Sequence, residues 1–328
     1  MEKNILEVEG LKTSFKTERG YLKAIDGVSF SVGPGEITGI VGESGCGKSV
    51  TMQSLMRLYE EKGNRVIYEG AVKLKGQNLL AIPEAEMKKI RGSRISMIFQ
   101  DALSALDPVY TIGEQIEETL KLHTKMNESE RRKKSEELLK TVGINEPERR
   151  LKQYPHELSG GMRQRVMIAI ALSCGPELLI ADEPTTALDV TIQAQIIDLL
   201  LDLNRTLGMS IILITHDMSV VSQICQKVIV MYLGQVVEEA DVYSLFDGPE
   251  HPYTQGLIRS IPKMEGQRPE RLYMIQGTVP LLSQIPRGCR FAPRCPRATD
   301  TCRKDMPALE EIRAGHKVRC WHPGRREN

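Results

Sequence analysis

Residues 36–49 read EITGIVGESGCGKS, in which an apolar run leads into the loop Gly42-Glu43-Ser44-Gly45-Cys46-Gly47-Lys48-Ser49. The loop has the pattern G-x-x-x-x-G-K-[ST], and the residues that follow it, SVTMQSLMRLY (49–59), have the composition of a helix. Glycines let a backbone wrap a phosphate without Cβ clashes, and the loop N–H groups and the helix N-terminus then point at the anion. Strand, glycine-rich loop and helix in this order predict an α/β fold with a nucleotide-phosphate site.

The phosphate contacts are expected from this loop and from the residue after it. In this pattern Lys48 bridges the β- and γ-phosphates and Ser49 ligates Mg²⁺. The expected contacts are Gly42, Ser44, Gly45, Cys46, Gly47, Lys48, Ser49 and Val50.

A pair of carboxylates follows a second apolar run, LLIADE (178–183). In phosphate-loop enzymes an Asp in the place of Asp182 holds Mg²⁺. The neighbouring Glu183 is suited to polarise an attacking water. Alone, the pair would be an acidic turn after a strand, but together with the phosphate loop it predicts a hydrolytic site.

The rest of the chain alternates strands and helices as far as about residue 245. RISMIF (94–99) and SIILIT (210–215) have the pattern of buried strands, and alternation with helices predicts a mainly parallel sheet. Residues 111–143 are charged and helical in pattern, with Asn127 as a candidate N-cap and Gly143 as a candidate C-cap.

Three regions follow from these patterns. Residues 1–245 form a nucleotide-binding domain, and about 101–158 of it form an inserted helical subdomain. In residues 246–328 Pro and Gly are frequent and periodicity fades, so we expect a small, loop-rich C-terminal extension.

The stretch Leu158-Ser159-Gly160-Gly161-Met162-Arg163-Gln164-Arg165 resembles the LSGGQ signature of ATP-binding-cassette ATPases, with Met162 in place of the usual Gln. A Ser-Gly-Gly that opens a helix is itself a small anion site. Since this chain already has a phosphate loop, the resemblance implies that Ser159, Gly160 and Gly161 contact the γ-phosphate held by another cassette.

Further elements of the family occur in the expected order. The resemblance implies that Gln100 senses Mg²⁺ and water, that Asp189 in the turn Ala187-Leu188-Asp189 lies at the dimer seam, and that His216 holds the γ-phosphate. It leaves the residue that stacks on adenine open, with Phe15, Arg19 and Tyr21 as candidates.

His251-Pro252-Tyr253-Thr254 resembles a segment after the cassette in dipeptide and oligopeptide importer ATPases, and the GMRQR variant is similar to the first of their two motor subunits. The resemblance implies ATP hydrolysis that powers peptide import, a heterodimer with a related cassette, two transmembrane permease subunits, and indirectly an external peptide-binding protein. The alternatives are a transporter of nickel or another small solute, a soluble cassette ATPase that acts on nucleic acid or ribosomes, and a non-enzymatic regulatory cassette.

The spacing of four late cysteines is C-x5-C-x6-C-x17-C, at Cys289, Cys295, Cys302 and Cys320. A reducing cytosol disfavours disulfides, and the spacing lacks the close Cys pairs of structural zinc sites. Similar cysteines occur in the importer branch, and the resemblance implies a [4Fe–4S] cluster. Zinc and four free thiols stay as alternatives.

Composition limits the remaining possibilities. With 44 basic and 43 acidic residues the formal net charge is +1, so there is no general case for nucleic-acid binding. The longest apolar run, residues 166–174, is short of the roughly 20 residues that span a bilayer, and the N-terminus has no apolar signal region. We expect a peripheral protein on the cytoplasmic face of the membrane, held there by its partners.

Overall fold

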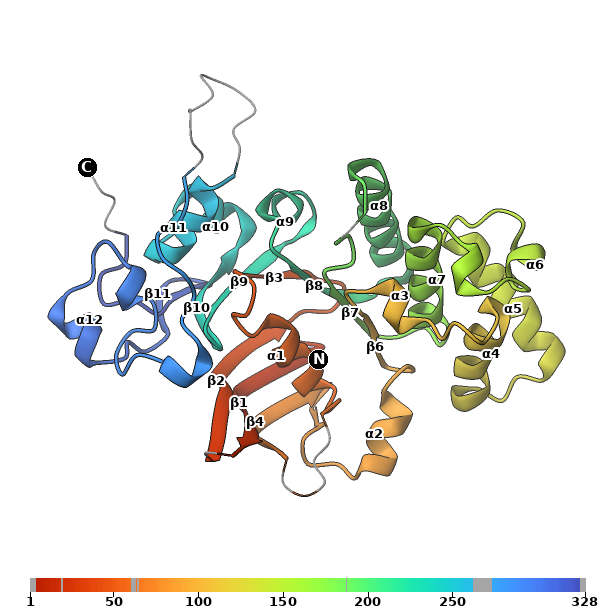
Figure 1. The fold of residues 1–328 in the computed structure, drawn as a ribbon, viewed down its shortest axis with the longest axis horizontal. Coiled ribbons are helices and arrows are strands. Elements are labelled where there is room, and N and C mark those ends of the chain that lie inside the picture. The colour runs from red at the N-terminus through yellow and green to blue at the C-terminus, as the bar shows by residue number, and fades with distance from the viewer. Residues whose placement is uncertain are drawn as a thin grey trace.

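The computed structural model describes residues 4–18, 20–59, 63, 65–186, 188–261 and 273–324 (Figure 1). An eight-stranded sheet runs through the centre of the molecule, and a four-stranded sheet lies beside it. The strands of the large sheet are, in spatial order, β11 (Glu310–Arg313), β12 (His316–Val318), β10 (Gln235–Asp241), β9 (Lys227–Tyr232), β3 (Ile37–Val41), β8 (Ser210–Thr215), β7 (Leu178–Asp182) and β6 (Ile95–Ile98).

The five strands β9, β3, β8, β7 and β6 run parallel, as predicted. Every residue of β3, β7 and β8 is buried, because helices and the second sheet cover both faces. The carboxyl ends of parallel strands meet at one edge of a sheet, which is where ligands bind in α/β folds. The phosphate loop and the segments that follow β6, β7 and β8 therefore lie at the same edge.

The second sheet is antiparallel, in the order β2 (Gly20–Val32), β1 (Leu6–Thr17), β4 (Val66–Leu74) and β5 (Gln77–Asn78). It shares a core with α1 (Lys48–Leu55) and one face of the large sheet. The short helix α2 (Glu84–Ile90) follows β5 and leads into β6.

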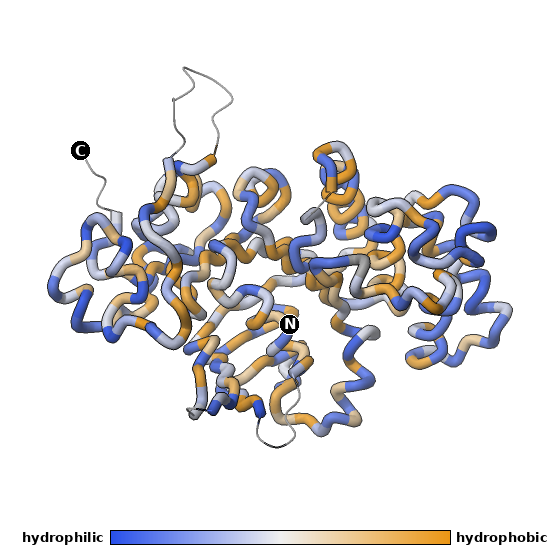
Figure 2. The backbone as a smooth tube through the Cα atoms, viewed as in Figure 1, coloured by the Kyte–Doolittle hydropathy of each residue, from blue (hydrophilic) through white to orange (hydrophobic). Residues whose placement is uncertain are grey.

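Helices gather at the end of the molecule beyond β6, where Figure 2 shows mostly hydrophilic residues on the outer turns. They are α3 (Ala102–Ala105), α4 (Ile112–His123), α5 (Glu128–Thr141), α6 (Pro147–Arg150) and α7 (Gly160–Leu172). The predicted helical stretch 111–143 is two helices, and the predicted N-cap Asn127 is confirmed, because its side chain accepts a hydrogen bond from the backbone N–H of Glu130. Gly143 follows the end of α5 with a left-handed φ of 73°.

The opposite end of the molecule is built by the C-terminal extension. The helices between β7 and the end of the described chain are α8 (Val190–Leu207), α9 (Met218–Ile224), α10 (Val242–Asp247), α11 (Pro252–Arg259) and α12 (Asp300–Lys304). β11 and β12 form a hairpin that extends the large sheet, with Val318 of β12 paired to Glu238 of β10. The boundary at 245/246 stays a prediction. Among the described helices, none is long and apolar enough to cross a membrane.

Candidate nucleotide site

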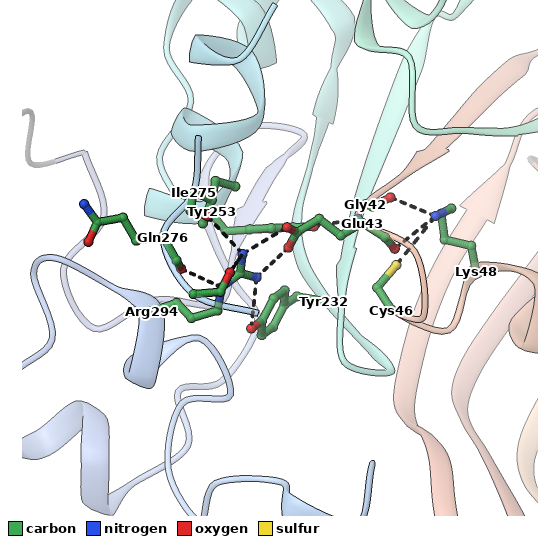
Figure 3. Close-up of polar contacts among 10 residues, drawn as sticks. Gly42, Glu43, Cys46, Lys48, Tyr232, Tyr253, Ile275, Gln276 and Arg294 are labelled. Carbon is green, nitrogen blue, oxygen red and sulfur yellow. Dashed lines mark hydrogen bonds and ion pairs between the residues drawn. The ribbon is translucent and has the colours of Figure 1, made fainter. Parts of the chain in front are cut away.

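The phosphate loop joins β3 to α1 and is held in shape by its glycines and by Lys48. A Cβ on Gly42 would lie 2.3 Å from the Met231 carbonyl oxygen, so only glycine fits there. The Lys48 side chain is 5% exposed, and its Nζ donates to the carbonyl oxygens of Gly42 at 2.7 Å and Glu43 at 3.2 Å (Figure 3). The loop therefore presents its backbone and one buried cation to the same space.

Oxygen ligands suited to magnesium lie next to this loop. Ser49 Oγ donates to Asp182 Oδ1 at 3.0 Å, which brings together the hydroxyl and the carboxylate that the sequence assigns to the metal. Burial raises the pKa of Asp182, whereas the Ser49 hydrogen bond opposes this rise. A hydroxyl and a carboxylate are donors that Mg²⁺ prefers, so the residues fit this ion.

The carboxylate of Glu183 lies close to the side chains of the other two predicted hydrolytic residues, Gln100 and His216. Its φ of 47° turns the chain sharply after β7. Its carboxylate accepts from Gln100 Nε2 at 3.0 Å and lies 3.5 Å from His216 Nδ1 and 4.0 Å from Lys48 Nζ. It also accepts from Thr186 Oγ1 at 2.9 Å, a contact that sequence reasoning missed. The structure thus places Gln100, Glu183 and His216 together, at the ends of three neighbouring strands.

A cavity of about 980 Å³ opens between these groups and the phosphate loop. Its described lining residues are Ala24, Glu43, Ser44, Gly45, Gly47, Lys48, Ser49, Val50, Gln100, Glu183, His216, Gly277, Thr278, Val279 and Leu282. Of the phosphate contacts predicted in the loop, Gly42 and Cys46 are not among the residues that line the cavity. Cys46 is buried, and burial raises the pKa of its thiol. The last four lining residues belong to the C-terminal extension and were not expected from the sequence.

The candidates for adenine stacking are not part of this lining. The Phe15 ring packs edge to face on Tyr59, with centroids 4.8 Å apart. Neither Phe15 nor Tyr21 is among the described residues that line the cavity. Arg19 lies outside the described residues.

Two side chains of the extension also form hydrogen bonds with Glu43 of the phosphate loop (Figure 3). The Arg294 guanidinium binds both carboxylate oxygens of Glu43, at 2.5 and 2.9 Å. The hydroxyl of the buried Tyr253 accepts a hydrogen bond from the Glu43 backbone N–H at 2.7 Å. Tyr253 lies in the segment that resembles importer ATPases, but no sequence pattern indicated these two contacts.

Comparison with known proteins agrees with this geometry. A family model described as "ABC transporter" matches residues 25–186, and one described as "Oligopeptide/dipeptide transporter, C-terminal region" matches residues 237–302. The chain is 52% identical, over 97% of its length, to the "Probable peptide ABC transporter ATP-binding protein y4tR" of Sinorhizobium fredii, of which it covers 94%. It is also 52% identical to the "Oligopeptide transport ATP-binding protein AppD" of Bacillus subtilis, covering 97% of this chain and 96% of that one.

This chain belongs to the ABC transporter family. Its fold matches a solved dimeric cassette, MJ0796 bound to ADP and Pi, with a TM-score of 0.64 at 30% identity, over 72% of this chain and 98% of that one. The predicted fold class, an ATP-binding-cassette α/β domain, is thereby confirmed. The chain is an ABC ATPase, and ATP and Mg²⁺ are the ligands that such an enzyme uses.

The cassette signature lies away from the cavity. Ser159 caps α7, its hydroxyl accepting from the Met162 N–H at 3.4 Å, and neither Ser159 nor Gly160 lines the nucleotide cavity. A Cβ on Gly161 would lie 2.9 Å from the Ile192 side chain, so this glycine lets α7 approach α8. Asp189 caps α8 through the Ile192 N–H at 2.9 Å, and Ala187 before it lies outside the described residues. That the signature serves another cassette stays a prediction.

The predicted [4Fe–4S] cluster at Cys289, Cys295, Cys302 and Cys320 is wrong. The four cysteines do line one small cavity. Within the described residues, however, no group of three or more His, Cys, Asp or Glu side chains is arranged to hold a metal ion. The zinc alternative has no support for the same reason. All seven cysteines of the chain are described, and none of them forms a disulfide.

The physical reason lies in the surroundings of the thiols. Burial raises the pKa of Cys289 and raises that of Cys320 to about 11, and the four sulfurs have other neighbours in the fold. Cys320 Sγ accepts a hydrogen bond from the His322 N–H at 3.3 Å, and Cys302 Sγ lies 3.3 Å from Thr299 Oγ1. Cys289 and Cys295 pack against the apolar core. The spacing of the cysteines along the chain does not indicate how each thiol is buried or which groups it contacts.

Proposed function

We propose that this ABC ATPase is the motor subunit of a membrane importer for dipeptides or oligopeptides. The observation that carries the proposal is the joint match of a cassette and of an oligopeptide/dipeptide transporter C-terminal region within one chain. The names of three relatives, which describe peptide, oligopeptide and dipeptide transport, support it. A nickel transporter or a nucleic-acid ATPase finds no comparable support.

In this proposal, the residues around the cavity divide the work of hydrolysis. Lys48 and the loop N–H groups hold the phosphates, and Ser49, Asp182 and Gln100 hold Mg²⁺, which supplies charge neutralisation when bound. Glu183 orients and polarises the attacking water, and His216 holds the γ-phosphate. Positioning and charge account for most of the catalysis in phosphoryl transfer, so little covalent chemistry is required of the protein.

Transport requires partners. We propose that two cassettes close head to tail, so that Ser159, Gly160 and Gly161 complete the nucleotide site of the neighbour. Similarity of the GMRQR variant to first motor subunits favours a related second cassette over a second copy of this chain. Two permease subunits would hold the pair at the cytoplasmic face of the membrane, and an external binding protein would deliver the peptide.

The test is ATP-dependent uptake by the reassembled transporter. The chain, its neighbouring cassette and the permeases are placed in proteoliposomes with the external binding protein, and uptake of labelled di- and oligopeptides is followed. We expect uptake that requires ATP and that is lost in the Glu183→Gln variant. Uptake of Ni²⁺ but of no peptide would contradict the proposal. Assembly only with a second copy of this chain would contradict the heterodimer.

A further inference from the structure

We propose that Thr186 is a positioning residue for hydrolysis. Its hydroxyl holds one oxygen of the Glu183 carboxylate, Oε2, so that the other oxygen, Oε1, is left to orient the attacking water. The inference rests on the role proposed above for Glu183, and not on which solute is transported.

The two carboxylate oxygens of Glu183 have different surroundings. Oε2 accepts hydrogen bonds from Thr186 Oγ1 at 2.9 Å and from Gln100 Nε2 at 3.0 Å, and it lies 3.5 Å from His216 Nδ1. Oε1 instead lies 4.0 Å from Nζ of Lys48, the residue assigned to the phosphates. Oε1 is therefore the oxygen on the side where the γ-phosphate and its attacking water are expected.

The three groups at Oε2 differ in what else they have to bind. In the proposed mechanism Gln100 contacts Mg²⁺ and His216 holds the γ-phosphate, and both line the nucleotide cavity. Thr186 is not among the described residues that line this cavity. When nucleotide draws the other two side chains toward itself, the Thr186 hydroxyl can therefore stay on Oε2.

A tight turn places the Thr186 hydroxyl beside the carboxylate. The Glu183 N–H donates to the Ile214 carbonyl of β8 at 3.0 Å, and the Thr186 N–H donates back to the Glu183 carbonyl at 3.1 Å. Pro184 occupies the second position of this four-residue turn, which its fixed φ favours. Glu183 itself has a left-handed φ of 47°, a conformation that is uncommon for residues other than glycine and that clusters at functional sites. The backbone thus fixes both ends of the hydrogen bond.

A competing role for Thr186 lies across the cassette dimer. Its side chain is exposed, and it lies shortly before Asp189, which the family resemblance places at the dimer seam. The hydrogen bond to Glu183 within the same chain favours the positioning role. The two roles differ in which nucleotide site loses activity when the hydroxyl is removed.

The experiment measures phosphate release by the full-length chain in the transporter reassembled with its neighbouring cassette and permeases, without added solute. The part of the rate that Glu183→Gln abolishes belongs to the site of this chain. We expect Thr186→Val to lower that part by roughly tenfold, because a misplaced reacting group slows the chemical step, with the KM for MgATP within twofold of wild type. Thr186→Ser keeps the hydroxyl and should stay within about threefold of wild type.

The matched control is Thr206→Val. The Thr206 hydroxyl donates to the Asp202 carbonyl on α8 at 2.6 Å and is exposed, so its removal should leave the rate as in wild type. Thermal unfolding of every variant reports whether the fold is kept. If Thr186→Val lost its fold, the comparison of Thr186→Ala with Thr186→Ser would replace it.

A double variant separates the positioning role from the competing one. The rate that remains in Glu183→Gln comes from the neighbouring cassette, and adding Thr186→Val should not change it, because the carboxylate on which the hydroxyl acts is already gone. A further fall would assign Thr186 to the neighbour's site or to the fold and would overturn the inference. So would a Thr186→Val rate within twofold of wild type beside an inactive Glu183→Gln site. Near-normal turnover in Glu183→Gln would instead refute the proposed role of Glu183, and the inference with it.

Discussion

Arg294 and Glu43, 251 positions apart in the chain, form a two-pronged ion pair with nitrogen–oxygen distances of 2.5 and 2.9 Å. The Arg294 side chain is 4% exposed and that of Glu43 is 29% exposed. Two parallel hydrogen bonds between charged groups are stronger and more directional than a single one. The pair therefore couples the position of the extension to the conformation of the phosphate loop.

Replacing Arg294 with Met should lower both stability and ATP affinity. Removing one partner of a buried ion pair costs about 3–5 kcal/mol, and the partial exposure of Glu43 reduces this to about 2 kcal/mol. Urea unfolding and MgATP binding check the two effects. Arg303→Met is the matched control, because its pair with Asp300 at 3.2 Å is largely exposed and should contribute less than about 0.5 kcal/mol. Equal losses in the two variants would contradict the coupling.

Tyr253→Phe removes only the hydroxyl that accepts from the Glu43 N–H. A buried donor left without a partner costs about 1–3 kcal/mol, so we expect a loss of about 1 kcal/mol in stability and weaker ATP binding. Thermal unfolding and nucleotide titration measure the change. Tyr243→Phe, at a side chain 84% exposed, should leave both quantities as in wild type. If the Tyr253 variant behaved like this control, the hydrogen bond would be of no consequence to the loop.

Glu183→Gln keeps the shape of the side chain and removes its charge. If Glu183 polarises the attacking water, phosphate release should fall by roughly 10²–10⁴-fold while MgATP affinity changes little. Steady-state phosphate release and equilibrium binding separate the two effects. Glu118→Gln, at an exposed position of α4, is the control. Near-normal phosphate release in the Glu183 variant would show that another residue polarises the attacking water.

Asp182→Asn tests the magnesium ligands. The Ser49 hydroxyl would still find a carbonyl oxygen as its acceptor, so the fold should be kept, whereas a neutral amide is a weaker ligand for a hard cation. We expect the gain in ATP affinity on adding Mg²⁺ to shrink by at least tenfold, with affinity in EDTA unchanged. Titrations with and without Mg²⁺ give both numbers. An undiminished magnesium effect would remove Asp182 from the site.

Acid should destabilise the protein through His251. Burial lowers the pKa of this residue to about 4, helped by Arg297 and Arg319 and opposed by Glu238. In the unfolded chain His251 takes up a proton near pH 6.5, whereas in the folded chain it takes one up only near pH 4. The free energy of unfolding therefore falls as the pH drops from 6.5 toward 4. This amounts to about 2 kcal/mol between pH 7 and pH 5. In urea unfolding, His251→Asn should flatten this pH dependence, and the exposed His156→Asn should not.

The central sheet could be predicted from the sequence because its strands obey local rules. Apolar runs such as LLIAD and SIILIT indicate buried strands, and the carboxyl ends of parallel strands meet at one edge. Gln100 and His216 were named by resemblance to the cassette family, and this rule explains why the structure places both beside Glu183. The start of α5 was visible too, since Asn is a preferred N-cap residue and Asn127 caps this helix.

The contribution of the extension could not be predicted, since it depends on contacts between distant parts of the chain. β11 and β12 are four and three residues long and largely polar, so no periodicity marks them as strands of the main sheet. Nothing around Arg294 indicates that its partner is Glu43. The cysteine pattern misled for a related reason: spacing gives separations along the chain, while metal binding depends on the direction and protonation of each thiol.

The pairing of β12 with β10 has a consequence for synthesis on the ribosome. β10 is complete at Asp241, but β12 begins only at His316, so about 75 residues must be added before part of the outer edge of β10 finds its partner. At roughly 5–20 residues per second, that edge stays open for about 4–15 s in the nascent chain. An open strand edge can pair with other chains. A strand translated about 75 residues after β10 thus covers the edge of a sheet whose parallel strands were made well before it.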